Sequence, residues 1–256
     1  MTSPSLAAFG RAPSRAGLFL DFDGVLADIA PEPDAAVIRH GVDALLVALS
    51  AKLGRVAVIS GRPVAYLDAM VPAEVDVVGL YGLEWRRRGV HHTLHEAEAY
   101  RDTVAEMVAD AEATFGPDVV EPKGLSLTIH YRRDDALAAP MRAWVIDQAE
   151  RTGMEQRPAK RSFELHPPIA RDKGTALVEL AEDLDPVAYF GDDLGDLPAF
   201  DGLDRLDQHG VATLRVAVDS PEVPPILRQR ADLVVDGPAG AEALLREILA
   251  VAESAG

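Results

Sequence analysis

The sequence predicts an α/β protein with a Rossmann-like, doubly wound parallel-sheet core and a second α/β domain inserted into that core. Short apolar runs recur along the 256 residues, and each is followed by a helical pattern, which is typical of βαβ units. The middle of the chain has a different pattern, in which extended segments follow one another in pairs rather than in crossover units. A chain of this length can form one large domain or a core with an insertion, and the change of pattern favours the insertion.

The core strands are expected where apolar runs end in polar or small residues. In order, we expect strands at residues 18–20, 56–59, 75–80, 187–190, 214–218 and 233–235, and a closing amphipathic helix at 239–252. Three of these strands lead into polar side chains, which are Asp21, Ser60 and Asp192. In an open parallel sheet, ligands bind at the carboxyl ends of the strands, near the point where strand order reverses. The three polar side chains can therefore line one pocket.

The inserted domain is expected between residues 93 and 167. Its pattern gives a helix at 96–115, strands near 119–121 and 125–132, a helix at 136–151, and extended segments at 155–158 and 162–166. The core then comprises residues 18–92 and 168–256. Residues 1–17 are small, polar and proline-containing, so we interpret them as a loose N-terminal leader.

The composition excludes several classes of function. The 25 Lys and Arg residues against 42 Asp and Glu give a formal charge of -17, which repels nucleic acid and anionic membranes. An anionic substrate meets the same field, so a phosphate pocket must gather Lys or Arg side chains locally. The sequence has no Cys, which excludes thiolate metal sites and a cysteine nucleophile and fits a cytoplasmic location. No apolar run approaches the length of a membrane span.

Two aspartates follow the first core strand. Successive side chains of an extended segment alternate, so Asp21 and Asp23 are expected on one side and Phe22 on the other. Gly24 permits a sharp turn that lets a phosphate or a metal approach the backbone. Carboxylates this close repel each other unless a cation lies between them, and oxygen ligands favour a hard ion such as Mg²⁺. One carboxylate can then act as a nucleophile while the other transfers protons.

A turn with two solvated acids explains this spacing equally well when the spacing is taken alone, because Asp and Gly are ordinary turn formers. Similar polar segments at the ends of other strands weaken that explanation. Ser60-Gly61-Arg62 follows an apolar strand and offers a hydroxyl, a backbone N–H and a guanidinium, which together can bind phosphate oxygens. The tripeptide by itself is weak evidence, since such sequences are common in exposed turns.

Lys173 and an acidic loop complete the candidate site. Asp172 is expected to cap a helix that has Lys173 in its first turn, where a cation opposes the helix dipole and needs an anionic partner. A solvated lysine is the alternative for this segment alone. The loop Gly191 to Asp196 supplies three more acids, of which Asp192 is best placed to bind a metal. A calcium-binding EF-hand is excluded, because the loop lacks the flanking helices and the glutamate at its twelfth position.

In this order and on these strand ends, the four segments resemble the haloacid dehalogenase superfamily of phosphotransferases. The resemblance implies roles in phosphoryl transfer for Asp21 as nucleophile, Asp23 as general acid and base, and Ser60 and Lys173 as residues that hold the phosphoryl group. It also implies a Mg²⁺ site made by the Asp21 carboxylate, the Asp23 carbonyl and Asp192. Asp193 and Asp196 are then supporting residues, with Asp196 able to orient Lys173 or a metal-bound water.

The insertion matches the cap of the subgroup whose cap is an α/β domain, and within it the chain resembles trehalose-6-phosphate phosphatases. The likeness runs from about residue 18 to 200 and includes segments 79–84, 121–132, 164–168 and 172–177. It implies contacts to the disaccharide and its phosphate from Glu121, Lys123, Arg132 and Glu164 in the cap, and from Gly61 and Arg62 in the core. The Lys and Arg residues of this set supply the local cations that the net charge requires. Lys123 and Arg132 can also be ordinary cross-strand surface charges.

Three positions depart from the family pattern. Leu197 stands where an acid is usual, Gly195 where a threonine is common, and His166 where an arginine is frequent. The first two remove polar side chains that would surround the metal ligands, which affects the affinity for the metal. The third affects which substrate the site is expected to bind.

The resemblance implies a Mg²⁺-dependent enzyme that hydrolyses trehalose 6-phosphate to trehalose and phosphate through an aspartyl-phosphate. One alternative is a related phosphatase for another phosphosugar, such as sucrose phosphate, a glycosyl phosphoglycerate or a hexose phosphate. Another is a sugar-phosphate-binding regulator without catalysis, against which the retained Asp21 and Asp23 argue. We expect a monomer whose partner is a small phosphorylated disaccharide, with no nucleic acid and no membrane partner.

Overall fold

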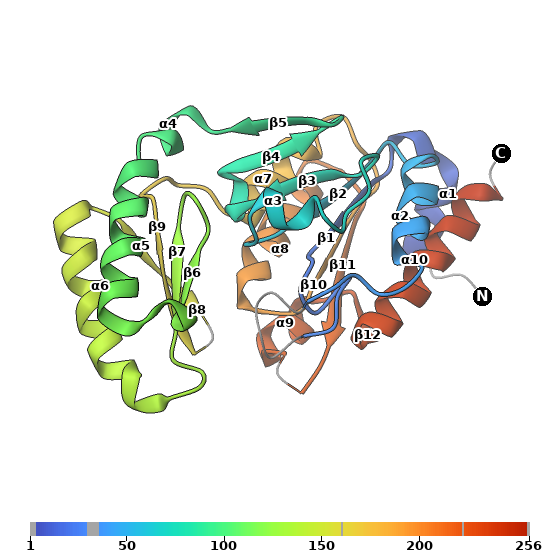
Figure 1. Ribbon diagram of the computed structural model, residues 1–256. Coiled ribbons are helices and arrows are strands. Elements are labelled where there is room, and N and C mark those ends of the chain that lie inside the picture. The colour runs from blue at the N-terminus through green and yellow to red at the C-terminus, as the bar shows by residue number, and fades with distance from the viewer. Residues whose placement is uncertain (1–3, 30–35, 160, 222, 255–256) are drawn as a thin grey trace. The chain divides into compact units, whose positions relative to one another are not determined.

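The computed structural model describes residues 4–29, 36–159, 161–221 and 223–254. The chain divides into two compact units, one formed by Met1–His92 with Arg171–Gly256 and the other by Thr93–Ala170. The second unit is therefore a continuous insertion into the first. Helices pack on strands in both units (Figure 1), as the predicted α/β class requires.

The first unit is built on an eight-stranded sheet in the order β12-β11-β10-β1-β2-β3-β4-β5. Its parallel strands are β1 (Gly17–Leu20), β2 (Arg55–Ile59), β3 (Asp76–Gly79), β10 (Val187–Gly191), β11 (Thr213–Asp219) and β12 (Leu233–Asp236). β4 (Glu84–Arg87) runs antiparallel to β3, and β5 (Val90–Thr93) forms the edge. All residues of β1 and β10 are buried, because a parallel sheet is covered on both faces.

β1 lies inside this sheet, at the point where the strand order reverses. From β1 the chain continues to β2 and β3 on one side, and after the insertion it returns as β10, β11 and β12 on the other. Leu20 of β1 is in register with Phe190 of β10 and with Val58 of β2. The carboxyl ends of these three strands therefore meet at one edge, which is where open α/β sheets bind ligands.

Helices cover both faces of the large sheet (Figure 1). They are α1 (Pro4–Arg11), α2 (Val42–Ser50), α3 (Val64–Leu67), α7 (Lys173–Leu180), α8 (Leu197–Gln208), α9 (Pro225–Arg230) and α10 (Gly237–Glu253). Leu18 and Leu20 of β1 lie in the apolar cluster with residues of α1, α2 and α10, whereas Phe19 lies in the cluster with residues of α7 and α8. This arrangement confirms the predicted doubly wound core.

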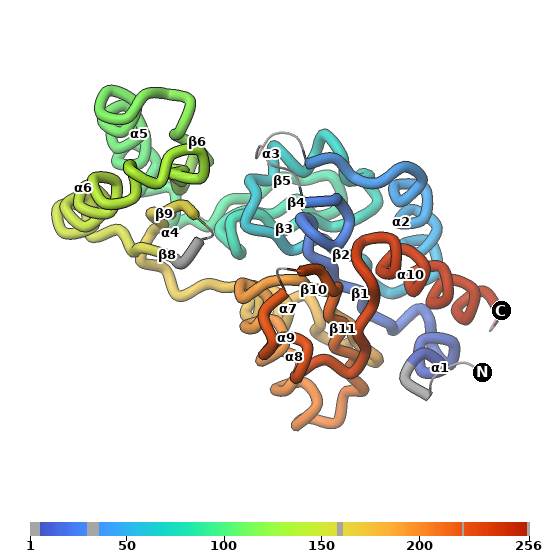
Figure 2. Tube along the Cα trace, turned by 90° about the horizontal axis from the view of Figure 1, so that it is seen from below, coloured from blue at the N-terminus to red at the C-terminus, as the bar shows by residue number. Residues whose placement is uncertain are grey.

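The predicted loose leader, residues 1–17, is wrong for the part that the structure describes. Leu6 and Phe9 of α1 are buried in the same apolar cluster as α10. A Cβ atom on Gly10 would lie 2.7 Å from a side-chain carbon of α10, and Figures 1 and 2 both show the two helices side by side. A helix of eight residues is too short for its apolar spacing to stand out in the sequence. Residues 1–3 lie outside the described residues.

The second unit packs two helices on one face of a small antiparallel sheet. The helices are α5 (Arg101–Phe115) and α6 (Ala138–Thr152), preceded by the short α4 (His95–Glu98). The strands, in the order β6-β7-β9-β8, are β6 (Val120–Pro122), β7 (Leu127–His130), β9 (Ser162–His166) and β8 (Glu155–Ala159). The consecutive strands β6 and β7 pair directly, and so do β8 and β9, as the sequence pattern predicts. The single helix predicted at 96–115 is divided into α4 and α5.

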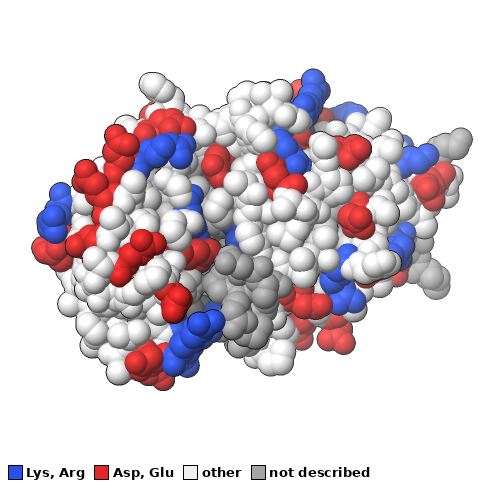
Figure 3. All heavy atoms as spheres, viewed as in Figure 1, with Lys and Arg blue, Asp and Glu red and all other residues white. Residues whose placement is uncertain are grey.

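Charged side chains of both signs are dispersed on one face of the protein (Figure 3). On the face seen in Figure 3, Lys and Arg side chains are interspersed among Asp and Glu. In the described parts of the chain, no helix combines the length and the apolar composition that a membrane crossing needs.

Candidate active site

Asp21 is the first residue after β1, at the carboxyl edge of the large sheet. Its backbone N–H donates to the carbonyl of Phe190 at 3.0 Å, which ties the start of the loop to β10. The N–H of Phe22 donates to Asp21 Oδ1 at 2.8 Å, and the Phe22 ring is buried in the apolar core. The Asp21 carboxylate is thus held at the strand end, where Asp21 as a residue is 5% exposed.

Gly24 brings the loop after β1 against the loop after β10. Its φ of +74° lies in the left-handed region, which favours glycine. A Cβ atom at this position would lie 2.2 Å from Asp192 Oδ2, a distance that no side chain tolerates. The glycine therefore lets the Asp192 carboxylate approach the backbone that carries Asp21 and Asp23.

Lys173 is the first residue of α7 and reaches into the acidic cluster. Asp172 caps this helix through a capping box with Thr175, which fixes the helix start. Lys173 Nζ lies 2.9 Å from Asp21 Oδ2 and 2.7 Å from Asp196 Oδ1, and the residue is 4% exposed. Burial lowers the pKa of Lys173, but Asp196 and Asp21 outweigh burial and hold it well above the ordinary value. The lysine is therefore charged and ion-paired.

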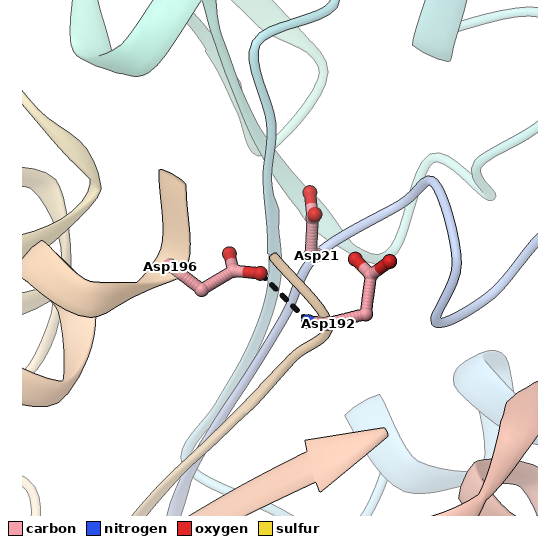
Figure 4. A group of neighbouring side chains, drawn as sticks. All are labelled: Asp21, Asp192 and Asp196. Atoms are coloured by element: carbon pink, nitrogen blue, oxygen red, sulfur yellow. Dashed lines mark hydrogen bonds between the residues drawn. The ribbon is translucent and has the colours of Figure 1, made fainter. Parts of the chain in front are cut away.

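Asp196 organises the loop after β10. Its Oδ1 accepts hydrogen bonds from Lys173 Nζ and from the Tyr189 hydroxyl, both at 2.7 Å. Its Oδ2 accepts from the N–H of Asp192 at 2.7 Å, which is the dashed line in Figure 4, and from the N–H of Asp193 at 3.1 Å. With four hydrogen bonds to a fully buried carboxylate, Asp196 holds the backbone of the loop and the lysine in place.

Three buried carboxylates converge from the two loops (Figure 4). Asp21, Asp192 and Asp196 each offer an oxygen atom, and these atoms lie within 4.8 Å of one another. Burial raises the pKa of Asp21 well above its ordinary value, although Lys173 opposes the shift. Burial, together with the charges of Asp196 and Asp21, raises the pKa of Asp192 to about 9. Full ionisation of all three carboxyl groups is therefore unfavourable in the metal-free protein, and a bound cation would favour it.

The residues of this cluster fit a divalent cation. Their donor atoms are carboxylate oxygens, the hard ligands that Mg²⁺ prefers, and Gly24 leaves open the space beside Asp192 that a Cβ would fill. The predicted ligands, Asp21, Asp23 and Asp192, share two members with the observed cluster, in which Asp196 takes the third place. Because the Asp196 oxygens already accept four hydrogen bonds, Asp21 and Asp192 are the carboxylates best able to take up an ion.

Asp23 pairs with Arg62 rather than with the carboxylate cluster. Arg62 Nε and Nη2 donate to its two oxygens, both at 2.8 Å, which fixes the orientation of the carboxylate. The guanidinium also lies over the ring of Tyr66, 4.7 Å from its centre. Ser60, at the end of β2, is buried, and its Oγ accepts a hydrogen bond from the Arg62 N–H at 3.1 Å. The segments after β1 and β2 are thereby joined at the same sheet edge.

The predicted sugar contacts belong to the second unit. Lys123 Nζ lies 3.6 Å from Glu164 Oε1, and Glu164 is buried on β9. Glu121 on β6 lies 2.8 Å from His130 Nε2. Arg132 follows the end of β7. Glu121 and Glu164 are each in register with the same residue of β7, so they lie in one row across the small sheet.

Sequence reasoning missed Tyr189, whose hydroxyl bonds to Asp196. It lies in an otherwise apolar strand and is fully buried. A usable signal was present, because a buried tyrosine normally finds a partner for its hydroxyl. Asp193 caps the turn that contains Gly195 by accepting its N–H at 2.7 Å, so the departures near the acidic loop leave that turn intact.

Solved structures share this architecture. A haloacid dehalogenase-like hydrolase from Bacteroides thetaiotaomicron matches with a TM-score of 0.62 and 16% identity, over 91% of this chain and 99% of its own. A trehalose-6-phosphate phosphatase related protein matches with a TM-score of 0.79 and 20% identity, over 93% of this chain and 99% of its own. This chain therefore shares the fold of these two proteins.

Sequence comparison identifies the family. Residues 19–232 match the trehalose-phosphatase family, so the chain belongs to it, and the predicted resemblance is confirmed. An uncharacterized glycosyl hydrolase of Mycobacterium tuberculosis is 37% identical over 216 residues, which cover 76% of this chain and 15% of the relative. A trehalose-phosphate phosphatase of Mycobacterium bovis is 33% identical over 223 residues, which cover 80% of this chain and 54% of the relative. The chain thus spans about half the length of the second relative and less of the first.

Proposed function

We propose that this protein is a phosphatase that hydrolyses trehalose 6-phosphate to trehalose and phosphate through an aspartyl-phosphate on Asp21. The observation that carries the proposal is the buried Asp21 carboxylate at the end of β1, held between Lys173 and Asp192 in a chain of the trehalose-phosphatase family. A carboxylate at such a position can attack phosphorus and can be regenerated by water.

The reaction proceeds in two displacements. The Asp21 carboxylate attacks phosphorus, the bond between phosphorus and the sugar O6 breaks, and Asp23 gives a proton to the departing oxygen. Asp23 then takes a proton from the water that attacks the aspartyl-phosphate, which releases phosphate and restores Asp21. The Asp23 side chain is 37% exposed and is oriented by Arg62, so it is accessible to a leaving group and to water.

Cationic and hydroxyl groups offset the charge of the phosphoryl group. We assign this role to Lys173 and Arg62, which supply the local positive charge that the acidic chain requires, and to Ser60, whose hydroxyl can donate a hydrogen bond to a phosphoryl oxygen. Mg²⁺, held by the carboxylates of Asp21 and Asp192 and by the Asp23 carbonyl, would supply further electrostatic stabilisation at the same place. Asp193 and Asp196 support this arrangement through the turn and the lysine.

The second unit provides the choice of sugar in this proposal. Glu121 and Glu164 accept hydrogen bonds from sugar hydroxyls, and a site built for such bonds discriminates strongly against ligands that lack them. Lys123 and Arg132 add positive charge for the phosphate. A small phosphorylated disaccharide is therefore the proposed partner, and the cytoplasmic location and the monomeric state stay predictions.

Phosphate release from a panel of phosphorylated sugars tests the function. The panel contains trehalose 6-phosphate, sucrose 6-phosphate and glucose 6-phosphate, each with and without Mg²⁺. We expect the highest kcat/KM for trehalose 6-phosphate and a strict need for Mg²⁺. If glucose 6-phosphate is hydrolysed equally well, the proposed specificity fails, and sugar binding without any turnover would favour a regulator instead.

Binding of Mg²⁺ is expected to release protons. In the metal-free protein the pKa of Asp192 is about 9, so its carboxylate is protonated at pH 7, whereas a metal ligand must be deprotonated. The affinity for Mg²⁺ should therefore rise as the pH increases towards 9, with release of about one proton per ion at pH 7. Isothermal titration calorimetry in two buffers of different ionisation enthalpy measures this release, and equal heats in both buffers would contradict it.

Gly61 is packed so closely against the ring of Tyr81 that a side chain at position 61 would force one of the two to move. A Cβ atom would lie 2.6 Å from the Tyr81 Cζ and hydroxyl oxygen. Gly61→Ala should displace the segment that carries Ser60 and Arg62 and lower kcat/KM by about 10–100-fold. Tyr81→Gly removes the ring and suits the backbone φ of +58°, so the double variant should recover much of the activity. Steady-state phosphate release tests both variants, and an unaffected Gly61→Ala enzyme would contradict the packing argument.

A further inference from the structure

The small sheet of the second unit has two chemically different faces. Leu127, Ile129 and Phe163 are buried in the apolar cluster that includes residues of α5 and α6. Because side chains alternate along a strand, Thr128 of β7 lies on the opposite face. Thr128 is in register with Glu121 of β6 and with a residue of β9, so it occupies the middle of the polar row across the sheet.

The acids that flank this threonine are held by neighbouring groups. Glu164, its register partner on β9, accepts a hydrogen bond from Ser126 Oγ at 3.2 Å and lies 3.6 Å from Lys123 Nζ. On the other side, Glu121 pairs with the ring of His130 at 2.8 Å. The row therefore combines carboxylates, hydroxyls and a cation on a long side chain, a set of groups that suits a ligand rich in hydroxyls.

Thr128 itself lacks such a partner. The residue is 3% exposed, and its Oγ1 makes no hydrogen bond to any residue that the structure describes. Buried polar side chains are almost always hydrogen-bonded, and one that is not costs free energy. Valine has the same branched shape without the hydroxyl, so the packing of the sheet does not require threonine here.

We propose that the Thr128 hydroxyl is a specificity-determining group that binds a hydroxyl of the sugar. The proposal rests on the proposed function. A threonine hydroxyl both donates and accepts, so it complements a sugar hydroxyl that also bonds to Glu121 or Glu164. The sugar reaches it by displacing the long side chain of Lys123 from Glu164. The unpaired hydroxyl is then satisfied only in the complex, which favours a ligand with a correctly placed hydroxyl over one without.

Thr128→Val tests this proposal, because it predicts opposite effects on stability and on binding. Removal of the unpaired hydroxyl should raise the thermal midpoint by about 2–6 °C. The same change should raise KM for trehalose 6-phosphate by about tenfold, with kcat/KM for p-nitrophenyl phosphate unchanged. Thr128→Ser retains the hydroxyl and should retain the KM of the parent enzyme. Thr114→Val, on the exposed surface of α5, is a matched control that should leave KM unchanged.

An unchanged KM in Thr128→Val overturns the proposal, whatever happens to the thermal midpoint. An unchanged KM with a lower midpoint is the result expected if the hydroxyl serves an internal water instead. If the parent enzyme prefers another phosphosugar, the proposed substrate fails separately, and the KM comparison is made with that sugar. If no phosphosugar is hydrolysed better than p-nitrophenyl phosphate, both the proposed specificity and the role of Thr128 fail.

Discussion

Asp21→Asn is expected to lower kcat for trehalose 6-phosphate by at least about 10⁴-fold while the protein stays folded. The amide cannot act as the attacking carboxylate, and no aspartyl-phosphate can form on it. The substitution keeps the shape of the side chain and leaves Lys173 paired with Asp196. Phosphate release measures the loss, and circular dichroism and the thermal midpoint report on the fold.

Asp219→Asn is a matched control for this experiment. Asp219 also ends a parallel strand of the same sheet, but it pairs with Arg228 and has no part in the carboxylate cluster. Its replacement should leave kcat unchanged. Full activity in Asp21→Asn would contradict the covalent mechanism, and an equal loss in both variants would show that the effect is not specific to Asp21.

Lys173→Met is expected to damage both stability and catalysis. Lys173 lies between Asp21 and Asp196, and its removal leaves the fully buried Asp196 carboxylate without its cation. Removing one partner of a buried ion pair costs about 3–5 kcal/mol in the free energy of unfolding. Loss of a cation that stabilises the transferring phosphoryl group should also lower kcat by about 10²–10³-fold.

Urea unfolding in the presence of a chelator measures the loss of stability. Lys52→Met, at an exposed position, is the control and should change the free energy of unfolding by less than about 0.5 kcal/mol. Added Mg²⁺ should restore part of the stability of Lys173→Met, because an ion bound by Asp21 and Asp192 replaces part of the positive charge that the variant lacks beside Asp196. An unchanged unfolding midpoint in Lys173→Met would contradict the role given to the lysine.

The strands of the core could be predicted from the sequence because they are buried on both faces. Their apolar runs are continuous, and the polar residues that follow, such as Asp21 and Ser60, mark where each strand ends. The edge hairpin β4–β5 and helix α1 were missed. β4 includes the buried Arg86, whose guanidinium donates hydrogen bonds to backbone carbonyls. The sequence of β4 is therefore too polar to be predicted as a buried strand. α1 is too short to show a clear period.

The types of residue in the site could be predicted, but most of their partners could not. The spacing of the motifs indicates that carboxylates, a lysine and an arginine gather at one sheet edge. It does not indicate that Arg62 binds the Asp23 carboxylate, whereas the contact of Asp196 with Lys173 was one of two alternatives expected for Asp196. These pairings depend on side-chain positions set by packing between segments far apart in the chain. The unpaired hydroxyl of Thr128 likewise becomes visible only when burial and hydrogen bonds are known.

In the proposed mechanism, Asp21 carries the phosphoryl group during turnover. The direct measurement is rapid acid quenching of the enzyme with trehalose 6-phosphate and Mg²⁺, followed by borohydride reduction and mass spectrometry of the peptides. An aspartyl-phosphate is reduced to homoserine, so we predict homoserine at position 21 in the parent enzyme and none in the unreacted protein. Full turnover with unmodified Asp21, or homoserine at another aspartate, would contradict a covalent intermediate on Asp21.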